Sequence, residues 1–376
     1  MTRARDFADV ISGNFDLPVG ALDNVPIPNV RPKNLIMNGG FQVAQRGTTY
    51  THSTPASSGN GFQTVDRWEF ASSNTDEAVI VQSQSTEVPS GQGFTNSYKI
   101  EVTTAESSIT SSEDAVFQTQ IEGQDLQHLA FGTSSAKKLT LSFWVRSSLT
   151  GKYSILFYQN TGPNPKQSNT PSFTISAADT WEKKVITLDG DTGGNINVTT
   201  NPGLLIRWVL AHGYSGTPHT GWGDYLNGTD NAHGDQVNFI LQTGTFYITG
   251  VQLEVGDTAT DFEFVSYADE LRRCQRYFQR VEGTVFPCSK VNGASSGSIT
   301  ATSTLLPIFN GVMRAEPTIT GANMTLRSEA GGTTATPTDL VSNAHKQSLV
   351  TATHNSADTT GVTQFRSDYF NIDAEL

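Results

Sequence analysis

Short segments of alternating apolar and polar residues recur along the chain and constrain its fold more than any other feature. In KLTLSFWVR, residues 138–146, one face of a strand carries Leu139, Leu141, Phe143 and Val145. In LLIRWVLA, residues 204–211, the same alternation sets out Leu204, Ile206, Trp208 and Leu210. Further candidate strands are AVIVQSQS, SYKIEVTT, AVFQTQIEG, KYSILFYQN, TWEKKVITL, VNFILQ and TFYITGVQLEV.

Turn signals such as PSGQG, NTGPNP and DGDTGGN separate these candidate strands. The segments between them show no helical periodicity. Strands with one apolar face pack most naturally as two antiparallel sheets. We therefore predict an all-β fold in which residues 34–265 form a jelly-roll β-sandwich.

The composition argues against several classes of function. Only 16% of the residues are charged, and 36 acidic against 24 basic residues give a net charge of −12. Such a chain repels a phosphate backbone on average, so we expect no nucleic-acid partner. No segment is apolar enough for a signal peptide or a membrane span, so we expect a cytoplasmically made protein without membrane insertion. Seven scattered histidines form no H-E-x-x-H pair, no phosphate loop occurs, and we expect no enzymatic activity.

The segment SYADELRRCQRYFQR predicts one connecting helix over residues 266–281. Ser266 followed three residues later by Asp269 is a helix start signal. An apolar stripe then runs through Tyr267, Leu271, Cys274, Phe278 and Val281. We favour packing of this stripe within the chain, and a short trimeric bundle is the alternative. Residues 282–376 return to a polar β pattern and predict a smaller C-terminal β-sandwich, with YFNIDAEL as a last strand that closes a sheet.

Residues 1–33 are too short to bury a core of their own, yet they are rich in apolar side chains. Phe15, Leu17, Leu22 and Val25 are examples, interspersed with prolines. We expect this segment to dock on another surface or on a neighbouring subunit, the alternative being a disordered tail.

The loop of residues 211–235 is the best candidate for a binding site. It combines aromatic and planar polar side chains between glycines: Tyr214, Trp222, Asp224, Tyr225 and Asn227. Sugar sites need an aromatic face for the C–H side of a ring and carboxylates or amides for its hydroxyls. The alternative is that the aromatic residues of this loop tuck under the sandwich as lids.

Metal and disulfide chemistry have weak support. Cys274 and Cys288 are interpreted as two reduced, buried thiols, with a bridge as the alternative. Asp189 and Asp191 in LDGDTGG form either a solvated turn or, less favoured, a structural calcium site. Glu254 lies in an apolar strand and needs a partner, a calcium ion or a strand-edge position, and we favour structural pairing, for example with an arginine. No cofactor is expected.

Three segments resemble a family of bacteriophage tail-fibre and related virion proteins that carry a jelly roll like that of carbohydrate-binding modules. These are NLIMNGGFQVAQRG (34–47), DRW (66–68) and FYITGVQLEVGDTATDFEFVSYADELRRCQRYFQR (246–280). The matching residues are Asn38, Gln45, Arg46, Asp66, Trp68, Gln252, Glu254, Glu263, Tyr267, Glu270, Leu271, Cys274, Gln275, Arg276 and Tyr277. MRAEPTIT and the closing DAEL are similar to the small β domain that often follows in this family.

The resemblance implies a non-enzymatic, homotrimeric virion protein that is attached by its N-terminal segment and binds host surface polysaccharide. It makes the DRW triplet and Glu254 framework residues and the 211–235 loop the contact region. The chain lacks the long shaft of large fibres, which implies a short tail fibre or a decoration protein, and we favour the short fibre. A decoration protein that contacts only other virion proteins is the second hypothesis, and a glycan depolymerase is the third.

Overall fold

The computed structural model describes residues 32–53, 61–73, 75–160, 166–213, 218–225, 231–287, 289–290, 299–303, 313–315, 317–322, 325–328, 339–342, 350–354 and 362–375. All of these except Pro32 and Lys33 belong to one compact unit, Asn34–Leu376. Several residues singled out in the sequence lie outside this set, so the hypotheses about them stay predictions; they are Phe15, Leu17, Leu22, Val25, Tyr214, Asn227 and Cys288.

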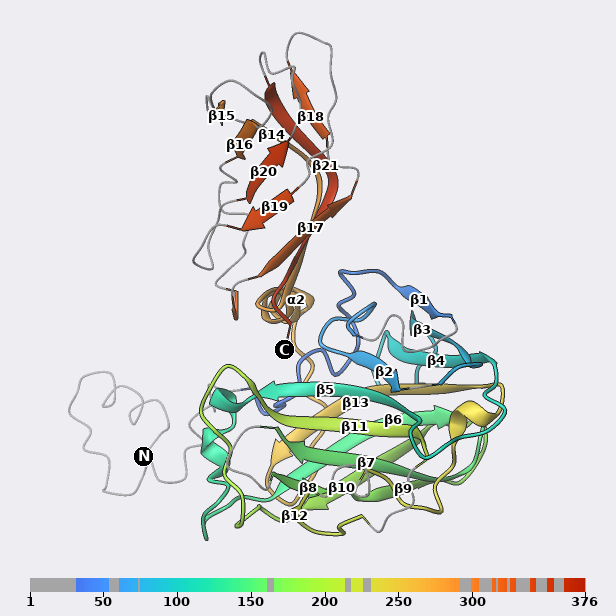
Figure 1. The fold of residues 1–376 in the computed structure, drawn as a ribbon. Helices are drawn as coiled ribbons and strands as arrows, with labels where there is room; N and C mark the ends of the chain where they lie inside the picture. Colours follow the sequence, from blue (N-terminus) through green and yellow to red (C-terminus); the bar gives the residue numbers. More distant parts are fainter. Residues whose placement is uncertain are drawn as a thin grey trace, which may run out of the picture. The chain divides into compact units, whose positions relative to one another are not determined.

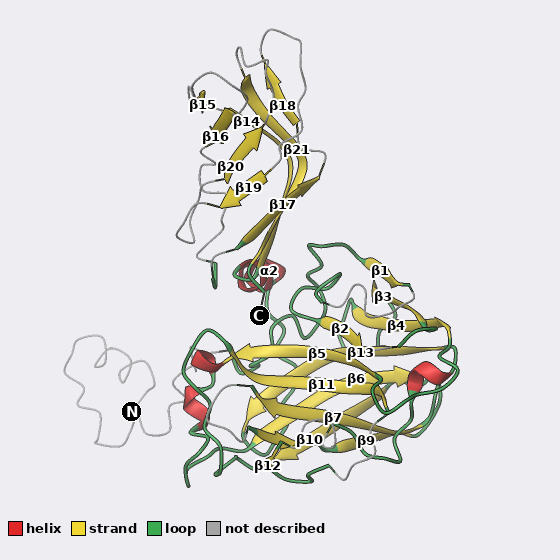
Figure 2. Ribbon diagram, viewed as in Figure 1, coloured by secondary structure: helices red, strands yellow, loops and turns green. Residues whose placement is uncertain are grey.

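Two antiparallel sheets form the predicted jelly roll (Figures 1 and 2). The six-stranded sheet has the order β1 (Thr49–His52), β3 (Val79–Ser85), β4 (Ser97–Thr104), β13 (Gly244–Val255), β6 (Leu139–Ser147), β10 (Glu182–Leu188). The seven-stranded sheet has the order β12 (Gly223–Asp224), β8 (Gln167–Asn169), β7 (Gly151–Gln159), β11 (Pro202–His212), β5 (Asp114–Glu122), β2 (Glu69–Ser73), with β9 (Ser172–Ile175) beside β7.

One apolar core lies between these sheets, as the alternation predicts. The four apolar residues of each of the two leading patterns, in β6 and β11, are all buried in it. Trp208 of one sheet meets Phe143 of the other edge-on, with ring centres 5.7 Å apart. Trp68 stacks on Phe117 at 4.8 Å in the same core. Of the candidate strands, VNFILQ is the one that was wrong, because Phe239–Leu241 forms a 3₁₀ turn; two more such turns are Gly123–Asp125 and Gln127–Leu129.

Strand β13 ties the start of the jelly roll to its end. The Asn34 side chain donates to the Val251 carbonyl at 3.0 Å and accepts from the Leu253 amide at 3.0 Å. The Val251 amide donates to the Gly39 carbonyl at 2.9 Å, and only a glycine fits there, because a Cβ on Gly39 would lie 2.0 Å from the Val251 oxygen. The first and last segments of the family-like pattern therefore meet in one place.

Helix α2 (Tyr267–Gln275) starts as predicted and ends earlier. The Ser266 hydroxyl accepts the Asp269 amide at 3.2 Å, which confirms the start signal. The prediction of a helix to residue 281 was wrong, since Phe278 already begins strand β14 (Phe278–Pro287). Tyr267 is 55% exposed, so the apolar stripe is not continuous, whereas Cys274 is buried as a free thiol. Within the described parts of the chain, no helix has the length and apolar character that crossing a membrane requires.

The predicted smaller C-terminal β-sandwich consists of two four-stranded sheets. The first contains β14, β17 (Thr318–Ala322), β18 (Thr325–Ser328) and β21 (Val362–Asp373), and the second contains β15 (Ser289–Lys290), β16 (Ile299–Ser303), β19 (Asp339–Ser342) and β20 (Val350–His354). Strand β21 pairs with β14, β17 and β18. The terminal segment thus lies at the centre of its sheet, and the prediction that it closes a sheet was wrong.

Candidate functional site

Two tyrosines form an aromatic pair on the outer side of the seven-stranded sheet. Along β7, the side chains of Tyr153, Ile155 and Phe157 enter the core, so the alternation turns Tyr158 to the opposite face. Strands β8 and β12 follow β7 in the sheet and bring Tyr225, next to the end of β12, to this place. The two ring centres lie 4.5 Å apart at an interplanar angle of 52°, and both side chains are half-buried.

Polar side chains surround this pair. The Lys166 ammonium lies 5.5 Å from the centre of the Tyr158 ring and donates to the Asn160 side chain at 3.0 Å. Asp224, whose exposed carboxylate accepts from the Gln167 amide at 2.7 Å, is next to Tyr225 in the chain, but the alternation turns it to the opposite face of the sheet. The Tyr225 hydroxyl donates to Asn231 at 3.0 Å. The arrangement offers aromatic surface, one ammonium and two side-chain amides within one small area.

A row of polar side chains crosses the next three strands on the same face. Arg207 on β11 is opposite Gln118 on β5, which in turn is opposite Glu69 on β2. The Arg207 Nε donates to Gln118 Oε1 at 2.6 Å, and Gln118 Nε2 donates to Glu69 Oε2 at 2.6 Å. Burial raises the pKa of Glu69, against the lowering effects of Gln118 and Arg207. Leu205 on β11 is opposite Tyr158, and Arg207 lies two residues further along the same strand. Measured along the strand direction, the row is therefore offset from Tyr158 by about 7 Å.

The structure separates the residues of the predicted loop site. Tyr225 belongs to the aromatic and polar cluster, whereas Asp224 binds Gln167 on the opposite face of the sheet. Trp222 instead packs edge-on against Phe131 at 5.4 Å, and its Nε1 donates to the Asp189 carbonyl at 2.7 Å, as the lid alternative requires. Tyr158 was missed, although the alternation of KYSILFYQN already placed it on the face opposite the core.

The acidic residues considered for a metal have partners of their own. Buried Asp191 accepts the amides of Gly193 and Gly194 and the Gln159 side chain, so a solvated turn was the wrong description. The exposed carboxylate of Asp189 pairs with Lys138 at 3.0 Å, and the two aspartates do not converge. Glu254 is bound by the amide and hydroxyl of Thr260, which confirms the expected structural pairing, with a threonine in place of the arginine.

A different trio of carboxylates lies close enough to share a cation. Oxygens of Asp76, Glu106 and Glu113 all lie within 4.8 Å of one another, and the two glutamates are buried. Glu106 accepts the amides of Glu77 and Ala78, at 3.3 and 3.1 Å. Burial raises the pKa of Glu106, an effect that these amides oppose.

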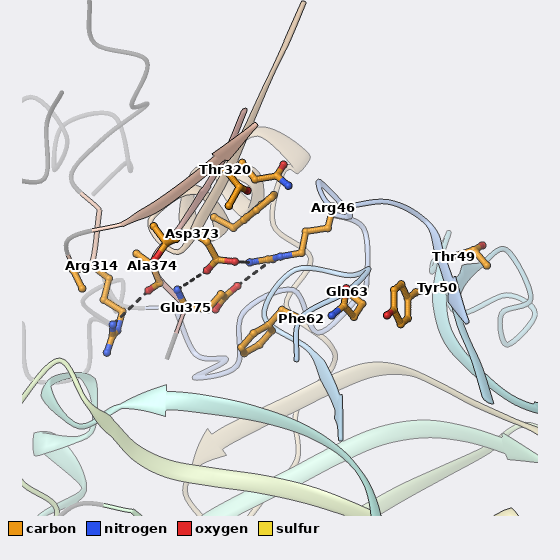
Figure 3. A pocket seen from close by; sticks show the side chains of 14 residues that line it. Arg46, Thr49, Tyr50, Phe62, Gln63, Arg314, Thr320, Asp373, Ala374 and Glu375 are labelled. Atoms are coloured by element: carbon orange, nitrogen blue, oxygen red, sulfur yellow. Dashed lines mark hydrogen bonds and ion pairs between the residues drawn. The ribbon is translucent and has the colours of Figure 1, made fainter. Parts of the chain in front are cut away.

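A second concave region lies where the jelly roll meets the C-terminal β-sandwich (Figure 3). It is a pocket of about 680 Å³. The jelly roll contributes Arg46, Thr49, Tyr50, Phe62 and Gln63, and the C-terminal part contributes Arg314, Thr318, Thr320, Asn371, Asp373 and Glu375. Figure 3 shows Arg46 pointing toward Asp373 and Glu375. Its guanidinium lies 3.0 Å from Asp373, 3.3 Å from Glu375 and 3.6 Å from the centre of the Phe278 ring.

Hydrogen bonds join several of the residues that carry the family resemblance to one another and to the jelly roll. The Asn38 amide donates to Glu270 at 2.6 Å, and the Gln45 amide donates to Asp66 at 3.0 Å. The Tyr277 hydroxyl donates to Glu122 at 2.7 Å. Asp66 and Trp68 are fully buried, which confirms the DRW triplet as framework.

No protein-family model matches the chain, and no curated protein sequence matches it. Similar solved structures include the enzymatically active domain of tailspike protein 4 of bacteriophage CBA120, at 14% identity and a TM-score of 0.33 over 59% of this chain and 21% of that chain. A putative sugar-binding protein from Bacteroides thetaiotaomicron is similar at 13% identity and a TM-score of 0.31 over 59% of this chain and 99% of that one. The family 11 carbohydrate-binding module from Clostridium thermocellum is similar at 12% identity and a TM-score of 0.29, over 57% of this chain and 99% of the module. Several of the similar structures are thus carbohydrate-binding modules with a jelly-roll fold.

Proposed function

We propose that the jelly roll binds carbohydrate at the tyrosine pair on the outer face of the seven-stranded sheet. The observation that carries this proposal is the closeness of Tyr158 and Tyr225, with ring centres 4.5 Å apart, beside the Lys166 ammonium. Aromatic rings cover the C–H face of a sugar, and planar carboxylates, amides and ammonium groups bind its hydroxyls. Lys166 and Asn160 supply the last two kinds of group at the same place.

The wider role that we propose is adhesion without cleavage. The chain is a short tail fibre that binds host surface polysaccharide, forms a homotrimer, and is attached to the virion by its N-terminal segment, including Phe15, Leu17, Leu22 and Val25. This role is supported by the sequence resemblance of residues 34–280 to tail-fibre and virion proteins. A decoration protein without a sugar ligand, or a depolymerase, would give different results in the tests below.

The first test is binding of the labelled, purified protein to candidate host cells, with and without competing surface polysaccharide. We expect saturable binding that the polysaccharide abolishes, and a loss of about tenfold or more in affinity for Tyr158→Ala and for Tyr225→Ala. The matched control is Tyr267→Ala, which removes an exposed tyrosine on α2 and should leave binding unchanged. Melting temperatures of all three variants separate lost binding from lost folding.

The outcomes distinguish the three hypotheses. Binding that both site variants reduce supports the adhesin. Absence of binding by folded wild-type protein to every candidate host would favour a decoration protein. Release of reducing ends from the polysaccharide would contradict adhesion without cleavage and favour a depolymerase.

A further inference from the structure

The pocket at the junction between the jelly roll and the C-terminal β-sandwich has the size of a small-ligand site. Its volume of about 680 Å³ falls within the range of pockets that hold small molecules. Both walls are needed to form it, because Tyr50, Phe62 and Gln63 come from one domain and Thr320 and Asn371 from the other.

The charges that line this pocket cancel. Arg46 and Arg314 contribute two positive charges, and Asp373 and Glu375 contribute two negative ones. An anion would meet the two carboxylates, and a cation would meet the two guanidinium groups, so either would lose as much as it gains. The lining therefore favours a neutral, polar ligand.

Three polar atoms of the lining have hydrogen-bonding capacity left over. Asn371 Oδ1 is buried and has no hydrogen-bond partner among the described residues. Arg46 Nη1 and Glu375 Oε1 are 3.3 Å apart as an ion pair, yet neither makes a hydrogen bond of good geometry. A buried polar atom without a hydrogen bond costs free energy that a ligand can recover. Two acceptors and one donor without a hydrogen bond therefore lie buried within the residues that line the pocket.

We propose that this pocket is a second carbohydrate site, separate from the tyrosine pair, and that it binds one neutral sugar unit. Sugar hydroxyls are donors and acceptors at once, so they suit a lining that combines guanidinium donors, carboxylate acceptors and the hydroxyl and amide groups of threonine, glutamine and asparagine side chains. The half-buried rings of Tyr50 and Phe62 offer apolar surface for the C–H face of the sugar. Because the ligand contacts both walls, it also stabilises the contact between the two domains by mass action.

The test uses full-length protein carrying Tyr158→Ala and Tyr225→Ala, so that the first site does not contribute. Saturation-transfer NMR and calorimetry measure binding of glucose, galactose, N-acetylglucosamine and rhamnose at millimolar concentrations. Glucuronate and glucosamine are the charged counterparts of glucose. We expect at least one neutral sugar to bind and to raise the melting temperature of the protein. The charged counterparts of that sugar should bind with an affinity at least about tenfold lower.

Two variants that spare the ion pairs of the junction locate the binding. Tyr50→Ala and Asn371→Ala should each weaken it about tenfold, whereas Thr103→Ala on the exposed end of β4 should leave it unchanged. The proposal is overturned if no neutral sugar binds this protein, if the two pocket variants bind as well as their parent, or if charged and neutral sugars bind equally. Each of these results leaves the first site intact, because that site is judged by cell binding of the protein with both tyrosines present.

Discussion

The guanidinium carbon of Arg67 lies 3.6 Å from the centre of the Tyr277 ring, in a contact that is closed to solvent. Arg67 immediately precedes the buried Trp68, and Tyr277 follows helix α2. Arg67 also donates to the Gln120 carbonyl at 2.8 Å and forms an ion pair with Glu375. It holds this position with a φ of 70°, in the left-handed region. One arginine therefore joins the jelly roll, the segment after the helix and the last residues of the C-terminal part.

Replacing Arg67 by methionine should lower the free energy of unfolding by about 3–5 kcal/mol, because Glu375 is left buried with less compensation. Urea denaturation measures the change. The control is Arg272→Met on α2, whose ion pair with Asp269 is exposed, and we expect a change below about 0.5 kcal/mol there. Equal effects of the two substitutions would contradict the role assigned to Arg67.

Asp66 should make stability depend on pH. Burial raises the pKa of Asp66 to about 6, although Arg46 and Gln45 lower it. The folded state therefore binds this proton more tightly than the unfolded state, and the contribution of Asp66 to stability falls as pH rises from about 4 to about 6. The full effect is on the order of 3 kcal/mol.

Asp66→Asn removes this dependence while it keeps the side-chain shape. The difference in unfolding free energy between variant and wild type should shift in favour of the variant between pH 4 and pH 7.5. The two proteins must be compared at each pH, because His52 also titrates in this range. Burial lowers the pKa of His52 to about 4, so its contribution to stability rises with pH and opposes that of Asp66 in both proteins. A constant difference across the range would show that Asp66 titrates normally.

Gly39 and Gly40 are neighbours that should respond differently to alanine. A Cβ on Gly39 would lie 2.0 Å from the Val251 oxygen, so Gly39→Ala should cost at least about 2 kcal/mol. A Cβ on Gly40 would lie 3.7 Å from Phe262, an ordinary contact, so Gly40→Ala should change stability by less than about 1 kcal/mol. Thermal unfolding of the pair measures both, and a reversed order is not compatible with this packing.

Trp222→Ala distinguishes a lid from a contact residue. Loss of the edge contact with Phe131 and of the hydrogen bond to Asp189 should lower stability by about 1–3 kcal/mol. Cell binding below the melting temperature should be retained. Weakened cell binding with an unchanged melting temperature would instead show that Trp222 contacts the ligand.

The strands of the jelly roll could be predicted because each buries one face, which leaves a period of two in the sequence. Leu141 and Phe143 show how directly this alternation translates into burial. The end of α2 could not be predicted in this way. Arg276 and Tyr277 both bind Glu122, some 154 and 155 residues earlier in the chain, and this distant contact leaves no local signal.

The candidate site likewise combines features that local sequence patterns predict with one that depends on distant parts of the chain. The alternation along β7 fixes the face of Tyr158, and the loop composition singled out Tyr225. That the two rings meet depends on the order of β7, β8 and β12 in the sheet, which neither pattern contains. The partner of Glu254 was missed for a related reason, because Thr260 reaches it through a turn outside the strand.

The bonds between Asn34 and β13 have a consequence for the synthesis of the protein. Asn34 and Val251 are separated by 217 positions, and at about 5–20 residues per second the ribosome needs roughly 10 to 40 s to pass from one to the other. From the completion of β4 until the synthesis of β13, β4 lacks the strand that pairs with its inner edge. A nascent chain with such an open edge invites pairing with other chains. Translation speed and chaperone supply in the producing cell should therefore limit the yield of folded protein more than the final stability of the jelly roll does.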